Sequence, residues 1–227
     1  MGRHHDGIEC AILTCSGTEA NEVALLMARQ ATNGRGIICT NAAYHGTSAA
    51  VRALTRLSTE VVSKTADVRA VSFPDTYRFV GDDPCSYYLE ELDQTIQSFR
   101  RDNVPFAGML VCSIFANEGL PNVPKEYLSK AAEIVHAAGG LLICDEVQSG
   151  LCRTGKWWGY QDMGVLPDIV TMGKPIGAGV PLAGVAASGE LVEKFRSETR
   201  YFNTFAASPL QAAAGNAVLD VIENEGI

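Results

Sequence analysis

Short apolar runs alternate with longer segments of helical periodicity along the chain, and this alternation restricts the possible fold more than any other feature. Most of the apolar runs lack the alternation of polar and apolar residues that is typical of a sheet with one solvent-exposed face. Both faces of these strands should therefore be buried under other elements. We expect strands at residues 8–13, 36–40, 108–114, 140–144, 169–172 and 182–187. Strands separated by helices predict an α/β fold, a mainly parallel sheet flanked by helices.

Four segments carry the helical spacing. One begins near Ala20, and others span residues 86–99, 125–138 and 209–223. The rest of residues 58–105 is irregular, because prolines and a glycine interrupt it. In the last helix the periodicity predicts these inward-facing residues: Leu210, Ala213, Ala214, Ala217, Val218 and Val221.

Composition excludes several classes of function. The net charge is -8 without a basic cluster, so a nucleic-acid surface is not expected. No apolar run approaches the ~20 residues that cross a bilayer, and residues 1–6 lack the apolar stretch of a signal peptide. The 7 cysteines form no C-x-x-C pair, which favours free thiols in a reducing cytoplasm over a metal site.

A candidate phosphate cradle lies at residues 15–22, where an expected strand leads into an expected helix. Ser16 can cap the helix, and Glu19 can complete a capping box. Gly17 allows close approach of a ligand, and Thr18 adds a hydroxyl beside the N–H groups of the helix start. A plain helix cap would explain the same residues.

Two further polar groups follow apolar strands. Asp145 and Glu146 end one strand. A carboxylate at such a position could bind a metal ion or a protonated ring nitrogen. No cluster of His or Cys residues nearby completes a set of metal ligands, so the sequence does not favour the metal. Lys174 ends another strand between Gly173 and Pro175. We expect partial burial of this lysine, which favours the neutral, nucleophilic amine, although a solvated loop lysine is the alternative.

The three features together match the demands of pyridoxal 5′-phosphate (PLP). Its phosphate needs donors, its ring nitrogen needs an anion, and its aldehyde needs an amine. The order along the chain is cradle, carboxylate and lysine. The combination predicts a PLP enzyme more strongly than any one feature does.

The motifs resemble those of the class III aminotransferases of PLP fold type I. The similar segments are Ser-Gly-Thr-Glu-Ala-Asn-Glu (16–22), Tyr-His-Gly (44–46), Asp-Glu-Val-Gln-Ser-Gly (145–150), Pro-Asp-Ile-Val-Thr-Met-Gly-Lys-Pro (167–175) and Tyr-Phe-Asn-Thr-Phe (201–205). The resemblance implies that residues 1–227 form the PLP-binding large domain, without the family's N-terminal segment and C-terminal small domain.

The resemblance also implies a role for each matching residue. The phosphate would lie at Ser16, Gly17 and Thr18, and Tyr44 would stack on the pyridine ring with His45 beside it.

Val147 would pack on the face of the pyridine ring opposite Tyr44. Asp145 would pair with the ring nitrogen, and Gln148 would reach the phenolic oxygen of the cofactor. Lys174 would carry the cofactor as a Schiff base. Thr204 would reach the phosphate of the neighbouring subunit in a homodimer.

The implied reaction is ping-pong transfer of an amino group from an amine or amino acid to a keto acid or aldehyde, with Lys174 and Asp145 as catalytic residues. Two alternatives stay open: a phospho-lyase acting on amino-alcohol phosphates, and a non-catalytic fragment. The chain departs from the family pattern at 113–119, 177–181 and 206–209, and in the first of these only Glu118 could replace the family's acidic residue.

Overall fold

A seven-stranded sheet forms the centre of the computed structural model, which describes residues 7–56 and 65–226. Residues 1–6, on which the signal-peptide prediction rests, lie outside the described part. The strand order is β1-β7-β6-β5-β4-β2-β3. The strands are β1 (Cys10–Thr14), β2 (Gly36–Thr40), β3 (Val68–Val71), β4 (Phe106–Val111), β5 (Leu141–Asp145), β6 (Ile169–Met172) and β7 (Ala183–Ala187).

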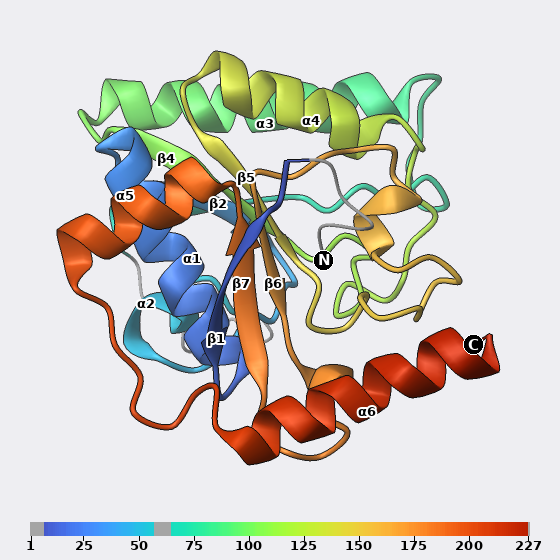
Figure 1. Cartoon of the computed structure of the whole chain (residues 1–227). Coiled ribbons are helices and arrows are strands. Elements are labelled where there is room, and N and C mark those ends of the chain that lie inside the picture. The colour runs from blue at the N-terminus through green and yellow to red at the C-terminus, as the bar shows by residue number, and fades with distance from the viewer. Residues whose placement is uncertain (1–6, 57–64, 227) are drawn as a thin grey trace.

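Helices cover both faces of this sheet (Figure 1). On one face α3 (Pro84–Arg101) and α4 (Tyr127–Ala137) pack side by side over a core that includes Leu92, Phe99 and Tyr127. On the other face α1 (Gly17–Thr32) and α5 (Gly189–Thr199) enclose a second apolar cluster. The predicted α/β layering is therefore confirmed.

The sheet is mixed, although most of it is parallel. Strands β3, β2, β4, β5 and β6 run parallel, and β7 is antiparallel to both β6 and β1. It follows that β1 runs in the same direction as β6. The carboxyl ends of β1, β2, β4, β5 and β6 therefore meet at one edge, where ligands bind in open α/β sheets.

The predicted strands are all present with small shifts in their ends, but one strand and two α-helices were missed. These are β3, the short α2 (Ala49–Arg52) and α5. Strand β3 has four residues at the edge of the sheet, two of them only half-buried, in a region where breakers obscure the pattern. Short, partly wet elements carry little hydrophobic periodicity, so the sequence gives a weak signal for them.

The inward face predicted for the last helix is wrong. Helix α6 (Pro209–Glu225) lies apart from the sheet and contacts the short 3₁₀ helix Lys174–Gly177 (Figure 1). Its buried residues are Gln211 and Gly215, whereas Leu210 is 69% exposed and Val221 44% exposed. The stripe that the periodicity identified is apolar, but most of it is exposed, and only Ala214 and Val218 are half-buried.

The described residues contain neither a membrane-spanning helix nor a cluster of metal-ligating side chains. No helix in residues 7–56 or 65–226 is both long enough and apolar enough to span a membrane. The same part of the chain contains no group of three or more His, Cys, Asp or Glu side chains placed to hold a metal ion.

Candidate active site

A cavity of about 310 Å³ opens at the edge where the parallel strands end. All the sequence-predicted site residues except Ser16 and Thr204 line it. The lining residues are Gly17, Thr18, Asn21, Tyr44, His45, Cys112, Asn117, Asp145, Val147, Gln148 and Lys174. Loops after β1, β2, β4, β5 and β6 all contribute, because these strands share a direction.

The first turn of α1 forms one end of the cavity. Ser16 caps this helix, since its Oγ accepts a bond from the Glu19 N–H at 3.2 Å. The expected capping box is wrong: the Glu19 carboxylate accepts from the Cys15 N–H at 2.7 Å and not from the Ser16 N–H. The N–H groups of Gly17 and Thr18 begin the helix and lie outside its internal bonding pattern, so an anion is favoured here.

Two glycines allow the loops to close around this end. A Cβ on Gly17 would lie 2.9 Å from Cγ2 of Val147, so Val147 packs directly on the cradle. Gly46 has a φ of +139°, and a Cβ there would collide with the Thr18 hydroxyl. Tyr44 lies two positions before this glycine, and the residue is 42% exposed, which leaves part of its surface open to a ligand.

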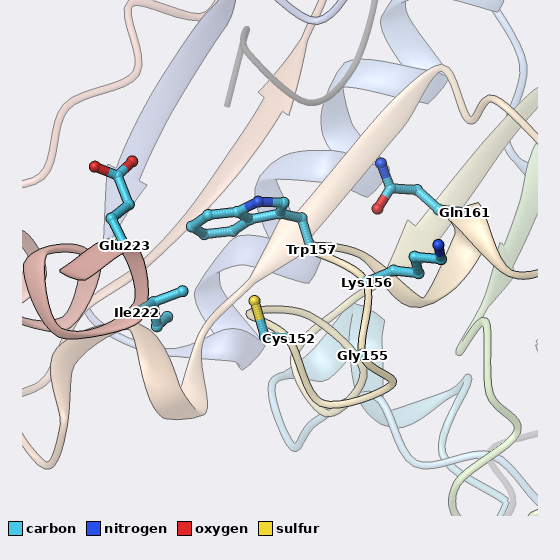
Figure 2. Close-up of a pocket in the computed structure, with 7 residues that line it drawn as sticks. All are labelled: Cys152, Gly155, Lys156, Trp157, Gln161, Ile222 and Glu223. Carbon is cyan, nitrogen blue, oxygen red and sulfur yellow. The ribbon is translucent and has the colours of Figure 1, made fainter. Parts of the chain in front are cut away.

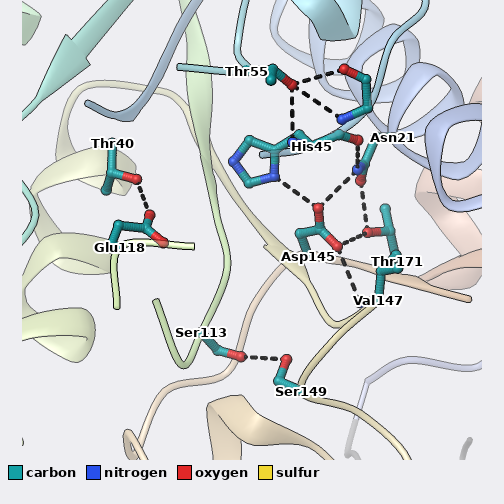
Figure 3. Close-up of polar contacts among 11 residues, drawn as sticks. Asn21, Thr40, His45, Thr55, Ser113, Glu118, Asp145, Val147, Ser149 and Thr171 are labelled. Carbon is teal, nitrogen blue, oxygen red and sulfur yellow. Dashed lines mark hydrogen bonds and ion pairs between the residues drawn. The ribbon is translucent and has the colours of Figure 1, made fainter. Parts of the chain in front are cut away.

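Asp145 is held in a network of hydrogen bonds at the end of β5 (Figure 3). Its carboxylate is buried and accepts from Asn21 Nδ2 at 2.9 Å and from the Val147 N–H at 3.1 Å. His45 Nδ1 lies 2.7 Å from the same carboxylate. These contacts fix the direction in which Asp145 faces the cavity.

Asn21 is a site residue that the sequence analysis did not assign. It lies in the 16–22 motif, one turn after Thr18, and is 1% exposed. Its neighbours Ala20, Val23 and Ala24 form the buried stripe of α1. A polar side chain inside an apolar helical stripe was the signal, because a buried amide needs hydrogen-bond partners.

Lys174 lies at the end of β6 and lines the cavity, but the expected partial burial is wrong because the residue is exposed. Its φ is +43°, in the left-handed region that residues other than glycine seldom adopt. The chain turns there into the 3₁₀ helix Lys174–Gly177. This sharp turn presents the lysine at the open mouth of the cavity.

Glu146 points away from the cavity, so only one of the acidic pair serves the site. Its buried carboxylate accepts from the N–H groups of Gly159 at 2.7 Å and Tyr160 at 3.0 Å, and from the Ser113 hydroxyl. Burial raises the pKa of Glu146, and these donors oppose that rise. Glu146 thereby fastens the loop at 159–160 to the end of β5.

Glu146→Ala is expected to lower the free energy of unfolding by about 3 kcal/mol, because buried donors lose their acceptor and a cavity forms. Urea denaturation followed by circular dichroism measures this change. Glu133→Ala, at an exposed position of α4, is the matched control and should change stability by less than about 0.5 kcal/mol. Equal stability of both variants would contradict the fastening role.

The 113–119 loop contributes differently from the expectation. Glu118 is hydrogen-bonded to the Thr40 hydroxyl (Figure 3). It does not line the cavity, whereas Asn117 and Cys112 do. Burial, with the Asp145 charge as a smaller cause, raises the pKa of Cys112 to about 12. The Cys112 thiol is therefore protonated at neutral pH and is no candidate nucleophile.

Thr204 is exposed and lies outside this cavity. Its loop is shaped by Asn203, whose Oδ1 accepts from the N–H groups of Phe205 and Ala206, both at 3.0 Å. Phe202 and Phe205 on either side are 79% and 76% exposed. Within its own chain, Thr204 does not contribute to the site.

A larger cavity, of about 620 Å³, lies between the loop at 152–161 and the end of α6 (Figure 2). Trp157 extends from the loop toward Ile222 and Glu223 of the helix (Figure 2). None of the sequence-predicted site residues lines this cavity. The grouping of carboxylate, lysine and helix start identifies the smaller cavity as the candidate active site.

Comparison with known proteins gives consistent matches along the chain. The family model described as "Aminotransferase class-III" matches residues 2–227. The curated alanine–glyoxylate aminotransferase 2 homolog 2, mitochondrial, of Arabidopsis thaliana is 39% identical over 96% of this chain and 45% of its own length.

Two solved structures are also similar. A phospholyase from Arthrobacter in complex with phosphoethanolamine has a TM-score of 0.93 and 38% identity, over 99% of this chain and 54% of that one. Taurine:2-oxoglutarate aminotransferase from Bifidobacterium kashiwanohense, in complex with PLP and glutamate, has a TM-score of 0.86 and 28% identity. That match covers 96% of this chain and 51% of the other.

The chain thus spans about half the length of the relatives it matches. The predicted fold, that of the PLP-dependent transferases, is confirmed. The family model covers nearly the whole chain, and the predicted motif residues converge on one cavity. The protein belongs to the class III aminotransferase family.

Proposed function

We propose that this chain is the PLP-binding large domain of an aminotransferase, which moves an amino group from an amine or amino acid to a keto acid or aldehyde. The observation that carries the proposal is the cavity that brings Thr18, Asp145 and Lys174 together. PLP supplies an electron sink for the substrate carbon when it is bound. The donor set fits each part of that cofactor.

The residues at the two ends of the cavity would bind and orient the cofactor. The start of α1 and the Thr18 hydroxyl offer donors to a phosphate, and the buried Asp145 offers an anion to a protonated ring nitrogen. Tyr44 and Val147 supply surfaces for the two faces of a flat ring, and Gln148 supplies an amide for a ring hydroxyl.

Lys174 would bind the cofactor covalently and act as the general base and acid. The residue is exposed and lines the cavity, so its amine would be available to bond to an aldehyde carbon. The free amine of Lys174 would serve as the base that takes the proton from the substrate carbon and as the acid that returns it to the carbon two atoms away. Asp145 would orient the ring nitrogen, since its hydrogen bonds to Asn21 Nδ2 and the Val147 N–H hold the carboxylate in place at the cavity.

A PLP titration of the protein tests this proposal. We expect saturable binding of PLP with a new absorption band at the edge of the visible range. Addition of an amino donor should then form pyridoxamine phosphate. The amino-donor screen also identifies the substrate class. Absence of binding would support the alternative of a non-catalytic chain.

A phospho-lyase acting on amino-alcohol phosphates is the second candidate. The similarity to the Arthrobacter phospholyase favours it, with 38% identity over 99% of this chain. Both reactions would use Lys174 and Asp145, so the site residues do not separate them. Assaying phosphate release from phosphoethanolamine against amino transfer to keto acids decides between them.

We also propose a homodimer in which Thr204 completes the phosphate site of the partner. Support comes from the exposure of Thr204, from its position outside its own cavity, and from the apolar surface of Phe202, Phe205 and Leu210. A polar residue between exposed aromatics is typical of an interface with a specific centre. In an isologous dimer each subunit would donate and receive one Thr204.

Thr204→Ala is expected to weaken PLP binding by about ten- to a hundredfold, because one hydrogen bond to a charged phosphate is lost. Mixing Thr204→Ala with Lys174→Ala subunits provides the control. In the mixed dimer, the subunit that keeps Lys174 receives an intact Thr204 from the Lys174→Ala subunit. This site should bind PLP normally. Equal weakness in the mixed dimer and in the Thr204→Ala homodimer would contradict a role across the interface.

We propose the cytoplasm as the location, on the ground that all 7 cysteines are free. The Arabidopsis relative is named mitochondrial. Fractionation of cells that express the full protein tests the location.

A further inference from the structure

We propose that Asn21 and Thr171 are positioning residues that aim the Asp145 carboxylate, acting as a directional hydrogen-bond relay from β6 through α1 to the end of β5. This inference rests on the proposed function, because the charge that Asp145 would meet is the ring nitrogen of PLP. Neither residue touches the reacting atoms in the proposal. Figure 3 shows Asn21 and Thr171 beside Asp145.

The relay is buried and its distances are short. The Thr171 hydroxyl donates to Asn21 Oδ1 at 2.7 Å, and Asn21 Nδ2 donates to Asp145 Oδ2 at 2.9 Å. Thr171 is 0% exposed and Asn21 is 1% exposed. Hydrogen bonds shielded from water in this way are stronger, and they restrict side-chain rotation.

Only one orientation of the Asn21 amide fits its surroundings. Its Nδ2 group donates to the backbone oxygen of His45 at 2.7 Å as well as to Asp145. A flipped amide would place its oxygen against this carbonyl and the carboxylate, which are both acceptors. The Thr171 hydroxyl, as donor to Asn21 Oδ1, holds the productive orientation.

The relay assigns different tasks to the two carboxylate oxygens of Asp145. Oδ2 lies within 2.9 Å of Asn21 Nδ2 and 2.7 Å of His45 Nδ1, which occupy its two acceptor positions. Oδ1 accepts from the Val147 N–H at 3.1 Å. The Thr171 hydroxyl is 3.5 Å from Oδ1, and its proton is already directed to Asn21. Oδ1 therefore retains acceptor capacity for a cationic N–H in the cavity.

His45 is consistent with the same assignment. Its Nε2 is buried and has no hydrogen-bond partner among the described residues. Its Nδ1 lies 2.7 Å from Asp145 Oδ2, and a carboxylate oxygen only accepts, so Nδ1 carries a proton that it donates to Asp145. His45 therefore helps to occupy Oδ2 and leaves Oδ1 to the cavity.

Thr171→Val provides the sharpest test, since valine keeps the shape and β-branching of threonine and replaces the hydroxyl with a methyl group. Thr171→Ser is the matched control, because it keeps the hydroxyl and loses the methyl group. The measurement is the dissociation constant of PLP and of its deaza analogue, in which C–H replaces the ring nitrogen. The ratio of the two constants reports the contact between Asp145 and the nitrogen.

In the wild type we expect PLP to bind more tightly than the deaza analogue. Thr171→Val should reduce this preference about three- to tenfold, the scale of one hydrogen bond, while Thr171→Ser largely keeps it. Asn21→Leu, which removes the bond to the charged carboxylate, should reduce the preference about ten- to a hundredfold. This second variant keeps the test decisive if Thr171→Val does not fold.

The contrary outcomes are distinct. A purely structural role would weaken binding of both ligands equally, and an unchanged preference in Thr171→Val and Asn21→Leu would overturn the relay alone. Failure of the wild type to bind PLP would instead overturn the proposed function, and the inference with it.

Discussion

Lys174→Ala is expected to abolish the visible absorption band of the protein with PLP and to lower amino transfer by more than about a thousandfold. The alanine has no amine to bond to the aldehyde, and no group remains to move the proton at the substrate carbon, which alone contributes on the order of 10²–10⁴-fold. Absorbance spectra and single-turnover kinetics measure the two effects.

The matched control for this variant is Lys130→Ala. Lys130 is half-exposed on α4, away from the cavity, where it pairs with Glu126. It should leave the band and the turnover unchanged. An intact band in Lys174→Ala would overturn the assignment of the cofactor lysine.

Asp145→Asn should reduce turnover by on the order of 10³-fold while the fold is retained. The amide has nearly the shape of the carboxylate but no charge, so a protonated ring nitrogen would lose its electrostatic partner. The cradle at Gly17 and Thr18 is untouched, and phosphate anchoring should persist. Steady-state kinetics, far-ultraviolet circular dichroism and a PLP titration measure the three properties.

Asp168→Asn is a useful comparison, since Asp168 lies at the start of β6 and bonds His136 and the Leu142 N–H outside the cavity. It should affect stability and not turnover. Turnover like that of the wild type in Asp145→Asn would refute the catalytic role of this carboxylate.

The local sequence was enough to identify the layered fold, the cradle, Asp145 and Lys174, and the family resemblance supplied Tyr44, His45, Val147 and Gln148. Polar residues directly after apolar strands mark the ligand edge, because parallel strands place all their carboxyl ends together. Asp145 and Lys174 could be found in this way, and the capping residues of the 16–22 segment predicted the start of a helix. These patterns lie within short segments, so they can be recognised without knowledge of the strand order.

Other features depended on residues far apart in the chain. The reversal of β7 between β1 and β6 brings the cradle beside the other strand ends, and no local pattern encodes a strand's direction. The periodicity of α6 predicted a buried face that is mostly exposed, because periodicity indicates an apolar surface but not whether another element covers it.

The hydrogen-bond partners of Asp145 were decided only by the tertiary structure. Asn21, His45 and Thr171 come from a helix, a loop and a strand, and are separated from Asp145 by 124, 100 and 26 positions. Glu146 has the same chemistry as its neighbour, yet directly after β5 it turns away from the cavity to Ser113, Gly159 and Tyr160. Sequence determined which groups were present, and packing determined which of them meet, because hydrogen bonds depend on distances that only the folded chain defines.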